Sequence, residues 1–65
     1  MGLTWQDPAE VAWALDDAHP GVDPLDLNFV DLHRMILDLP GFDDDPDAAS
    51  ESILEAIVVA WNDQR

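Results

Sequence analysis

Two Pro-Gly pairs, Pro20-Gly21 and Pro40-Gly41, divide this chain of 65 residues into three short segments. Proline followed by glycine interrupts a helix, so no helix is expected to run through either pair. A chain of this length holds one small domain, and we expect that domain to cover residues 1–65. The chain has no cysteine, so disulfides and thiolate metal sites cannot stabilise it. It must fold on an apolar core.

The segment before the first pair predicts a helix that begins after Asp7 and ends at Pro20-Gly21. Asp7 is a suitable N-cap and proline is favoured at the first helical position that follows it. Glu10 completes a capping box with Asp7. An apolar stripe follows at helical spacing: Val11, Leu15 and Ala18.

The middle segment predicts a short extended piece and then a second helix. Leu25, Leu27 and Phe29 alternate with polar or small positions, which is typical of a strand. The helix is expected from about Asp31 to Leu39, and Val30 before it is a poor N-cap. Its apolar stripe is Leu32, Met35, Ile36 and Leu39.

The third helix could begin at Asp45-Pro46 or after Ser50, and we favour Ser50 as its N-cap. Its apolar face is Ile53, Leu54, Ile57, Val58 and Trp61. The other two tryptophans have different expected places. Trp5 should pack over the start of the first helix, whereas Trp13 lies off the apolar stripe and should be exposed and available to a partner.

The fold class indicated is therefore a mostly α, small three-helix domain with at most very short strands. A three-helix core with little sheet is compatible with a trimmed winged helix or helix-turn-helix, which would suggest DNA binding. The charge excludes that function, because the chain has 15 acidic residues against Arg34 and Arg65, a formal net charge of −13. Such a field repels nucleic acid and anionic lipid and attracts basic proteins and cations.

Location is also constrained. No apolar run has the length of a membrane span, and the N-terminus lacks the basic flank and apolar stretch of a secretory signal. We expect a cytoplasmic protein.

The segment GFDDDPD, residues 41–47, is the strongest local concentration of charge, and we call it the acidic loop. Three interpretations stand: a solvated loop, a docking surface for a basic partner, or a site for a hard cation. The spacing does not fit an EF-hand. With Asp43 at the first position of the loop, Ala48 stands where glycine is required and Leu54 stands where glutamate is required. His33 and Asp38 on the second helix are close enough in sequence to add ligands.

Other functions fit less well. The chain has no cysteine or lysine and no recognisable Ser-His spacing, and it is too small for a deep pocket, so we expect no enzyme. Ser52-Ile53-Leu54 faintly resembles the serine motif of acyl carriers, but Glu51 replaces the expected aspartate. An acidic protein that mimics nucleic acid, or docks on another basic partner without iron binding, remains the alternative.

Four stretches together resemble the IscX (YfhJ) family of iron–sulphur cluster assembly proteins: MGLTW, DPLDLNFVDLH, LPGFDDDP and ESILEAIVVAW. The resemblance runs without gaps over essentially the whole chain. It implies a modified winged-helix fold and a non-enzymatic adaptor that binds the cysteine desulfurase IscS through an acidic surface. It also implies weak, reversible iron binding through carboxylates, competition with frataxin, and contact with the scaffold IscU.

The resemblance also implies site residues. The metal ligands it implies are Asp43, Asp44, Asp45, Asp38 and His33. The partner-binding residues it implies are Asp17, Asp23, Asp31, Asp43, Asp44 and Asp45. Asn28 stands where the family has an arginine, and Met35 stands where it often has a tryptophan. The lost basic residue makes this chain more acidic than is usual for the family.

Overall fold

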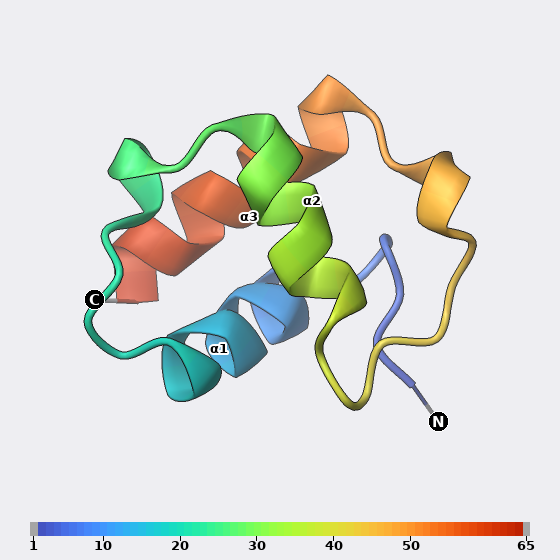
Figure 1. Cartoon of the computed structure of the whole chain (residues 1–65), viewed down its shortest axis with the longest axis horizontal. Helices are drawn as coiled ribbons and strands as arrows, with labels where there is room; N and C mark the ends of the chain where they lie inside the picture. The colour runs from blue at the N-terminus through green and yellow to red at the C-terminus, as the bar shows by residue number, and fades with distance from the viewer. Residues whose placement is uncertain (1, 65) are drawn as a thin grey trace.

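A computed structural model describes residues 2–64 and contains three α-helices and two short 3₁₀ turns. The helices are α1 (Pro8–Ala18), α2 (Phe29–Leu37) and α3 (Glu51–Gln64), and the 3₁₀ turns are η1 (Pro24–Asp26) and η2 (Pro46–Ala48). In Figure 1, α2 crosses in front of the pair formed by α1 and α3, and the segment between α2 and α3 swings out to one side. The predicted mostly α class is confirmed.

Helix α1 has the predicted bounds, but its N-terminus is held differently from the capping box. Asp7 is the N-cap residue, yet its side chain makes no cap hydrogen bond. Its Oδ2 accepts instead from the Thr4 hydroxyl at 3.0 Å, and its own N–H donates to the Thr4 carbonyl at 3.1 Å. The carboxylate and the backbone N–H of Asp7 are therefore both bonded to Thr4, in the turn before the helix. The predicted capping box with Glu10 is wrong.

Helix α2 begins two residues earlier than predicted, and the extended piece before it does not form. Asn28 is the N-cap, and its Oδ1 accepts from the Asp31 N–H at 2.8 Å. This bond satisfies one of the free N–H groups of the first turn, so the weak cap at Val30 is irrelevant. Upstream, Pro24 starts η1, where the Asp23 Oδ1 accepts from the Leu25 N–H at 3.0 Å.

Helix α3 begins where predicted, since Ser50 Oγ accepts from the Ile53 N–H at 3.3 Å. The core lies between the three helices. It consists of Trp5, Val11, Ala12, Leu15, Leu32, Ile36, Leu39, Leu54, Ile57 and Trp61. Most residues of the predicted apolar stripes thus face inward. The exceptions are Ala18, which is exposed, and Met35, Ile53 and Val58, which are half-buried against the core. No side-chain polar group is buried without a partner among residues 2–64.

Pairing of β type is limited, in the described residues, to one parallel bridge between Leu3 and Phe42. The expectation of at most very short strands is confirmed, and residues 2–64 contain no hairpin that would form a wing. None of the helices in this part of the chain is long and apolar enough to cross a membrane.

Candidate functional site

The acidic loop is fastened to the N-terminal segment by backbone hydrogen bonds. Leu3 N–H donates to the Gly41 carbonyl at 2.6 Å, and Asp43 N–H donates to the Leu3 carbonyl at 2.8 Å. Gly2 allows this close approach. A Cβ added there would overlap the Asp43 Cβ and come within 2.8 Å of the Gly41 carbonyl oxygen. The start of the loop is therefore held by the N-terminal segment, which is far from it in the sequence.

Trp5 is the main anchor of the loop. Its indole Nε1–H donates to the Asp45 carbonyl at 2.6 Å, and its backbone N–H donates to the Asp44 Oδ2 at 3.0 Å. The ring is 4% exposed and meets the Phe42 ring edge-on, with the centroids 4.6 Å apart. A buried indole with its N–H paired is a rigid support. The acidic loop is consequently a shaped surface rather than a free tether.

The carboxylates of the loop divide into two kinds. Asp44 accepts at both oxygens, because its Oδ1 also takes the Asp45 N–H at 2.7 Å. Asp45 Oδ1 caps η2 by accepting from the Asp47 N–H at 2.9 Å. Asp43 and Asp38 are exposed and their carboxylates make no hydrogen bond to residues 2–64. Asp44 and Asp45 therefore shape the loop, whereas Asp43 and Asp38 are open to ligands.

His33 is brought to the loop from the middle of α2. Its Nε2 lies 2.7 Å from the Pro46 carbonyl oxygen, so this nitrogen carries the proton that it donates. Its ring lies 5.6 Å from the Trp5 ring, centroid to centroid. His33, Trp5 and Phe42 thus support the loop from beneath, and the imidazole Nδ1 is the nitrogen that remains for another ligand.

The structure brings only some of the implied metal ligands together. His33 reaches the loop that carries Asp43, Asp44 and Asp45, as the sequence suggested. Within residues 2–64, however, no three histidine, aspartate or glutamate side chains are grouped closely enough to hold a metal ion. A cation bound by this loop would therefore keep much of its water shell or require side chains to move.

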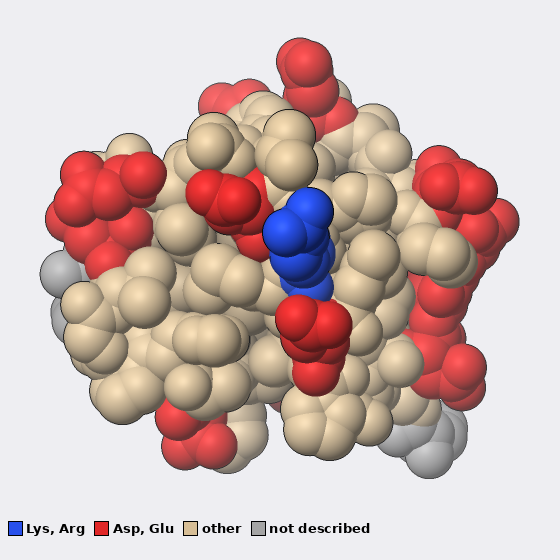
Figure 2. All heavy atoms as spheres, viewed as in Figure 1, with Lys and Arg blue, Asp and Glu red and all other residues tan. Residues whose placement is uncertain are grey.

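The implied partner-binding acids are spread over the molecule. Asp17 lies in the last turn of α1 and Asp23 precedes η1, and both segments lie on the opposite side of the view in Figure 1 from the acidic loop. Asp31 is in the first turn of α2. Figure 2 shows acidic residues, in red, around the rim of this face and beside the single blue residue near its middle, with a run along the right-hand edge, where Figure 1 places the loop. Arg34 is the one lysine or arginine among residues 2–64. The two ends of this acidic surface cannot meet the same small ligand.

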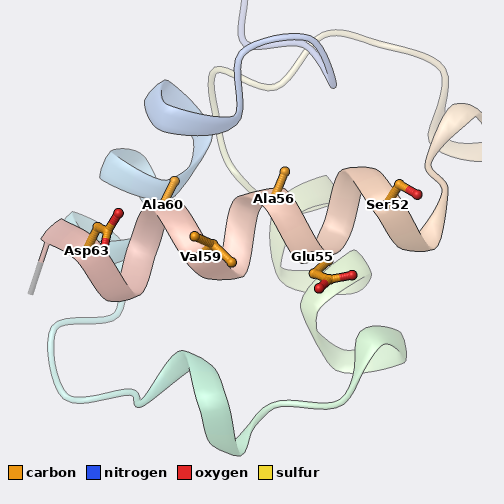
Figure 3. A pocket seen from close by; sticks show the side chains of 6 residues that line it. All are labelled: Ser52, Glu55, Ala56, Val59, Ala60 and Asp63. Carbon is orange, nitrogen blue, oxygen red and sulfur yellow. The ribbon is translucent and has the colours of Figure 1, made fainter.

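The outer face of α3 carries a separate shallow hollow of about 490 Å³. Figure 3 shows its lining, which comes from this one helix: Ser52, Glu55, Ala56, Val59, Ala60 and Asp63. Ser52 has no histidine beside it in this lining, so the face offers no activated nucleophile of the Ser-His kind. Its chemistry is that of an exposed helix surface.

Sequence reasoning found the acidic loop but missed what holds it. Trp5 was expected to pack over the start of α1, and its two hydrogen bonds to the loop were not foreseen. Gly2 was not singled out at all. Neither role has a local signal, because the contacts of Trp5 with the loop join residues 39 and 40 positions apart.

These features define the class of the protein: a small, strongly acidic helical domain that presents carboxylates on a supported loop. A family model described as iron-sulphur cluster assembly matches residues 3–65. The chain belongs to this family, the IscX/YfhJ family, as its sequence indicated. An uncharacterised protein of Pseudomonas aeruginosa is similar to it, with 49% identity over 65 residues that cover 100% of this chain and 98% of the relative. The family is described by cluster assembly rather than by a catalysed reaction.

Proposed function

We propose that the protein is a non-enzymatic adaptor of iron–sulphur cluster assembly that docks on the cysteine desulfurase IscS through its acidic loop. The observation that carries this proposal is the exposed Asp43 on a loop held in place by Trp5, in a chain with a net charge of −13. Membership of the assembly family supplies the context. Complementary potentials between such a surface and a basic patch raise the association rate and fade as salt increases.

Other acids extend the proposed contact. Asp31 lies in the first turn of α2, the helix that also carries His33. Asp17 and Asp23 would meet a different part of the partner, since they lie on the other side of the domain. Competition with frataxin for the desulfurase, and contact with the scaffold IscU, are further parts of this proposal, and they rest on the family resemblance alone.

Weak and reversible iron binding is the second part of the proposal. Oxygen donors suit a hard cation, and carboxylates without sulfur ligands release it readily. Asp43 and Asp38 supply open carboxylates. Both oxygens of Asp44 already accept backbone N–H groups, whereas Asp45 accepts through Oδ1 only and keeps Oδ2 for a cation. His33 would bind through Nδ1, because Nε2 is bonded to Pro46. The site would therefore be labile, which suits sensing or delivery rather than storage.

The docking proposal is tested by the rate of association with purified IscS at low and high salt. Asp43→Lys reverses a charge whose carboxylate supports no hydrogen bond in residues 2–64, so it changes electrostatics without disturbing the loop. Asp45→Asn removes a charge but keeps an oxygen that can cap η2. Glu55→Lys, at an exposed position of α3 outside the proposed contacts, is the matched control for the same change in net charge.

Asp43→Lys is expected to slow association several-fold at about 0.05 M salt and much less at about 0.5 M, where the Debye length is short. Glu55→Lys should have a smaller effect at both salt concentrations. Equal slowing by the two variants would show that net charge acts without a defined docking loop. Absence of binding at low salt would remove the desulfurase from the proposal.

Iron binding is tested separately by calorimetry with ferrous ion, with calcium as the control cation. Heat with iron that Asp43→Asn and His33→Gln both reduce would support the site. Equal heat with the two ions would indicate charge screening in place of an iron site.

A further inference from the structure

Trp13 lies on the solvent side of α1 and is the one tryptophan that the core does not enclose. Its side chain is 65% exposed, compared with 4% for Trp5 and 0% for Trp61. An indole left in water gains nothing for the fold, and tryptophan is the residue most enriched among energetically dominant interface positions. The acidic loop makes no use of Trp13, because the described contacts of the loop involve other residues.

Two carboxylates lie on the same face of α1 as this indole. Glu10 is three residues before Trp13 and Asp17 is four residues after it, so all three side chains line one strip of the helix. All three are exposed. Helical side chains lean towards the N-terminus, which places the indole over the turn that carries Glu10. The strip therefore combines an aromatic face with negative charge at each end.

An open hollow lies beside the indole. It is lined by Ala9, Glu10, Trp13 and Gln64, with a volume of about 360 Å³. Gln64 Nε2 donates to the Ala9 carbonyl at 3.1 Å and so ties the end of α3 to the start of α1. The hollow is thus a joint feature of two helices, and it is suited to the apolar stem of a long side chain.

The charges on this strip are not neutralised within the described chain. Asp16, the neighbouring acid, accepts from the Trp61 Nε1–H at 3.3 Å and belongs to the α1–α3 contact. Glu10 and Asp17 make no hydrogen bond or ion pair with residues 2–64 through their carboxylates. The only lysine or arginine in that range is Arg34, which lies on α2. Charge complementarity therefore calls for a cation from another molecule.

We propose that the strip Glu10–Trp13–Asp17 is a second docking surface and that its occupant is an arginine side chain of a basic protein. A guanidinium stacks flat on an indole and offers several N–H donors to a flanking carboxylate. Lysine presents a compact, strongly hydrated charge and gains less from the same face. The arginine stem lies in the hollow beside Gln64, and its head lies between the indole and one of the two acids.

The surface extends the adaptor function to two contacts on different sides of the domain. That this arginine belongs to the desulfurase rests on the proposed function. Recognition of an arginine by the strip does not depend on it. Two contacts on one domain raise its overall affinity for the partner even when the affinity of each contact is unchanged. Once the first contact has formed, the second forms at a high effective concentration.

The test follows the Trp13 indole N–H by nitrogen-15 NMR while two peptides of equal charge are added to the full chain. The probes are acetylated Arg-Gly-Gly-Arg amide and acetylated Lys-Gly-Gly-Lys amide. The arginine peptide is expected to shift the Trp13 indole signal and to bind about 3- to 5-fold tighter than the lysine peptide. Trp13→Leu, followed through the Glu10 and Asp17 amides, should abolish that preference. Val59→Ala, at a 55% exposed apolar position on α3, is the control and should retain it.

Equal responses to the two peptides, or none at the Trp13 indole, would overturn the proposal. So would a dimer in sedimentation that Trp13→Leu dissociates, because the strip would then bind a second copy of the chain. With the desulfurase, Trp13→Leu should weaken binding about 5-fold. If the chain binds no desulfurase but keeps its arginine preference, the proposed function fails and the arginine surface stands. If the chain binds the desulfurase but shows no preference for arginine, the arginine surface fails and the proposed function stands.

Discussion

Replacing Trp5 by phenylalanine should weaken the whole fold through its link to the acidic loop. Phenylalanine keeps an aromatic ring against Phe42 but removes the indole N–H that donates to the Asp45 carbonyl at 2.6 Å. Loss of one such hydrogen bond costs about 1 kcal/mol. The smaller ring also leaves roughly 40 Å² less apolar surface buried, which adds about 1 kcal/mol. The expected loss is about 2 kcal/mol, a large share of the stability of a domain this small.

The assay is urea unfolding followed by far-UV circular dichroism, which does not depend on the tryptophan signal. With a slope of about 1 kcal/mol per molar urea, the midpoint should fall by about 2 M. Trp13→Phe is the matched control, because Trp13 is 65% exposed and its replacement should change stability by less than about 0.5 kcal/mol. Amide exchange in residues 43–47 should also accelerate in Trp5→Phe. Equal midpoints for the two variants would refute the assignment of Trp5 as the anchor of the loop.

Three further outcomes are expected. Asn28→Ala removes the cap bond to Asp31 and should cost about 1 kcal/mol in urea unfolding, while Asn28→Asp, which keeps the acceptor, should stay within about 0.5 kcal/mol; equal losses would show that the cap bond does not matter. Gly2→Ala should accelerate hydrogen exchange of the Asp43 amide, because a Cβ at residue 2 overlaps the loop. Gly21→Ala adds a Cβ in open space, so its urea midpoint should be equal to or higher than that of the unchanged chain. Finally, the thermal midpoint should rise by several degrees between about 0.01 M and about 0.2 M NaCl, because salt screens the self-repulsion of a chain with a net charge of −13; an unchanged midpoint would contradict this reasoning.

The helices could be predicted from sequence because their signals are local. The start of α1 at Pro8 and the N-cap of α3 at Ser50 both lie in short patterns of adjacent residues. Trp61 and Trp13 were placed correctly, inside and outside, from helical spacing alone. Periodicity of apolar residues is sufficient for such assignments, since it reports which side of a helix is buried.

The start of α2 was predicted wrongly because two local signals competed. Alternation of Leu25, Leu27 and Phe29 resembles a strand, but Asp23-Pro24 begins a 3₁₀ turn and Asn28 caps a helix. The capping side chains decide the outcome, as each satisfies a backbone N–H that a strand edge would leave unpaired.

The candidate site was only half predictable. The acids of residues 43–47 are obvious in the sequence, but which of them remain open is not. Asp44 and Asp45 accept backbone N–H groups, one of them from Trp5, whereas Asp43 does not. That difference arises from contacts between distant parts of the chain, so no local pattern reports it.

The bond between Trp5 and Asp45 also sets an order of events during folding. Its partners are 40 residues apart, so the contact forms only after a long stretch of chain has closed. Until then, the residues of the loop explore many conformations, and fixing the backbone of each residue costs about 1–2 kcal/mol of conformational entropy. Binding of a partner to a chain that has not finished folding would have to offset this entropy loss, so the affinity would be low. If the loop docks as proposed, it would bind well only when the domain is complete, and the partner would discriminate against chains that are still folding.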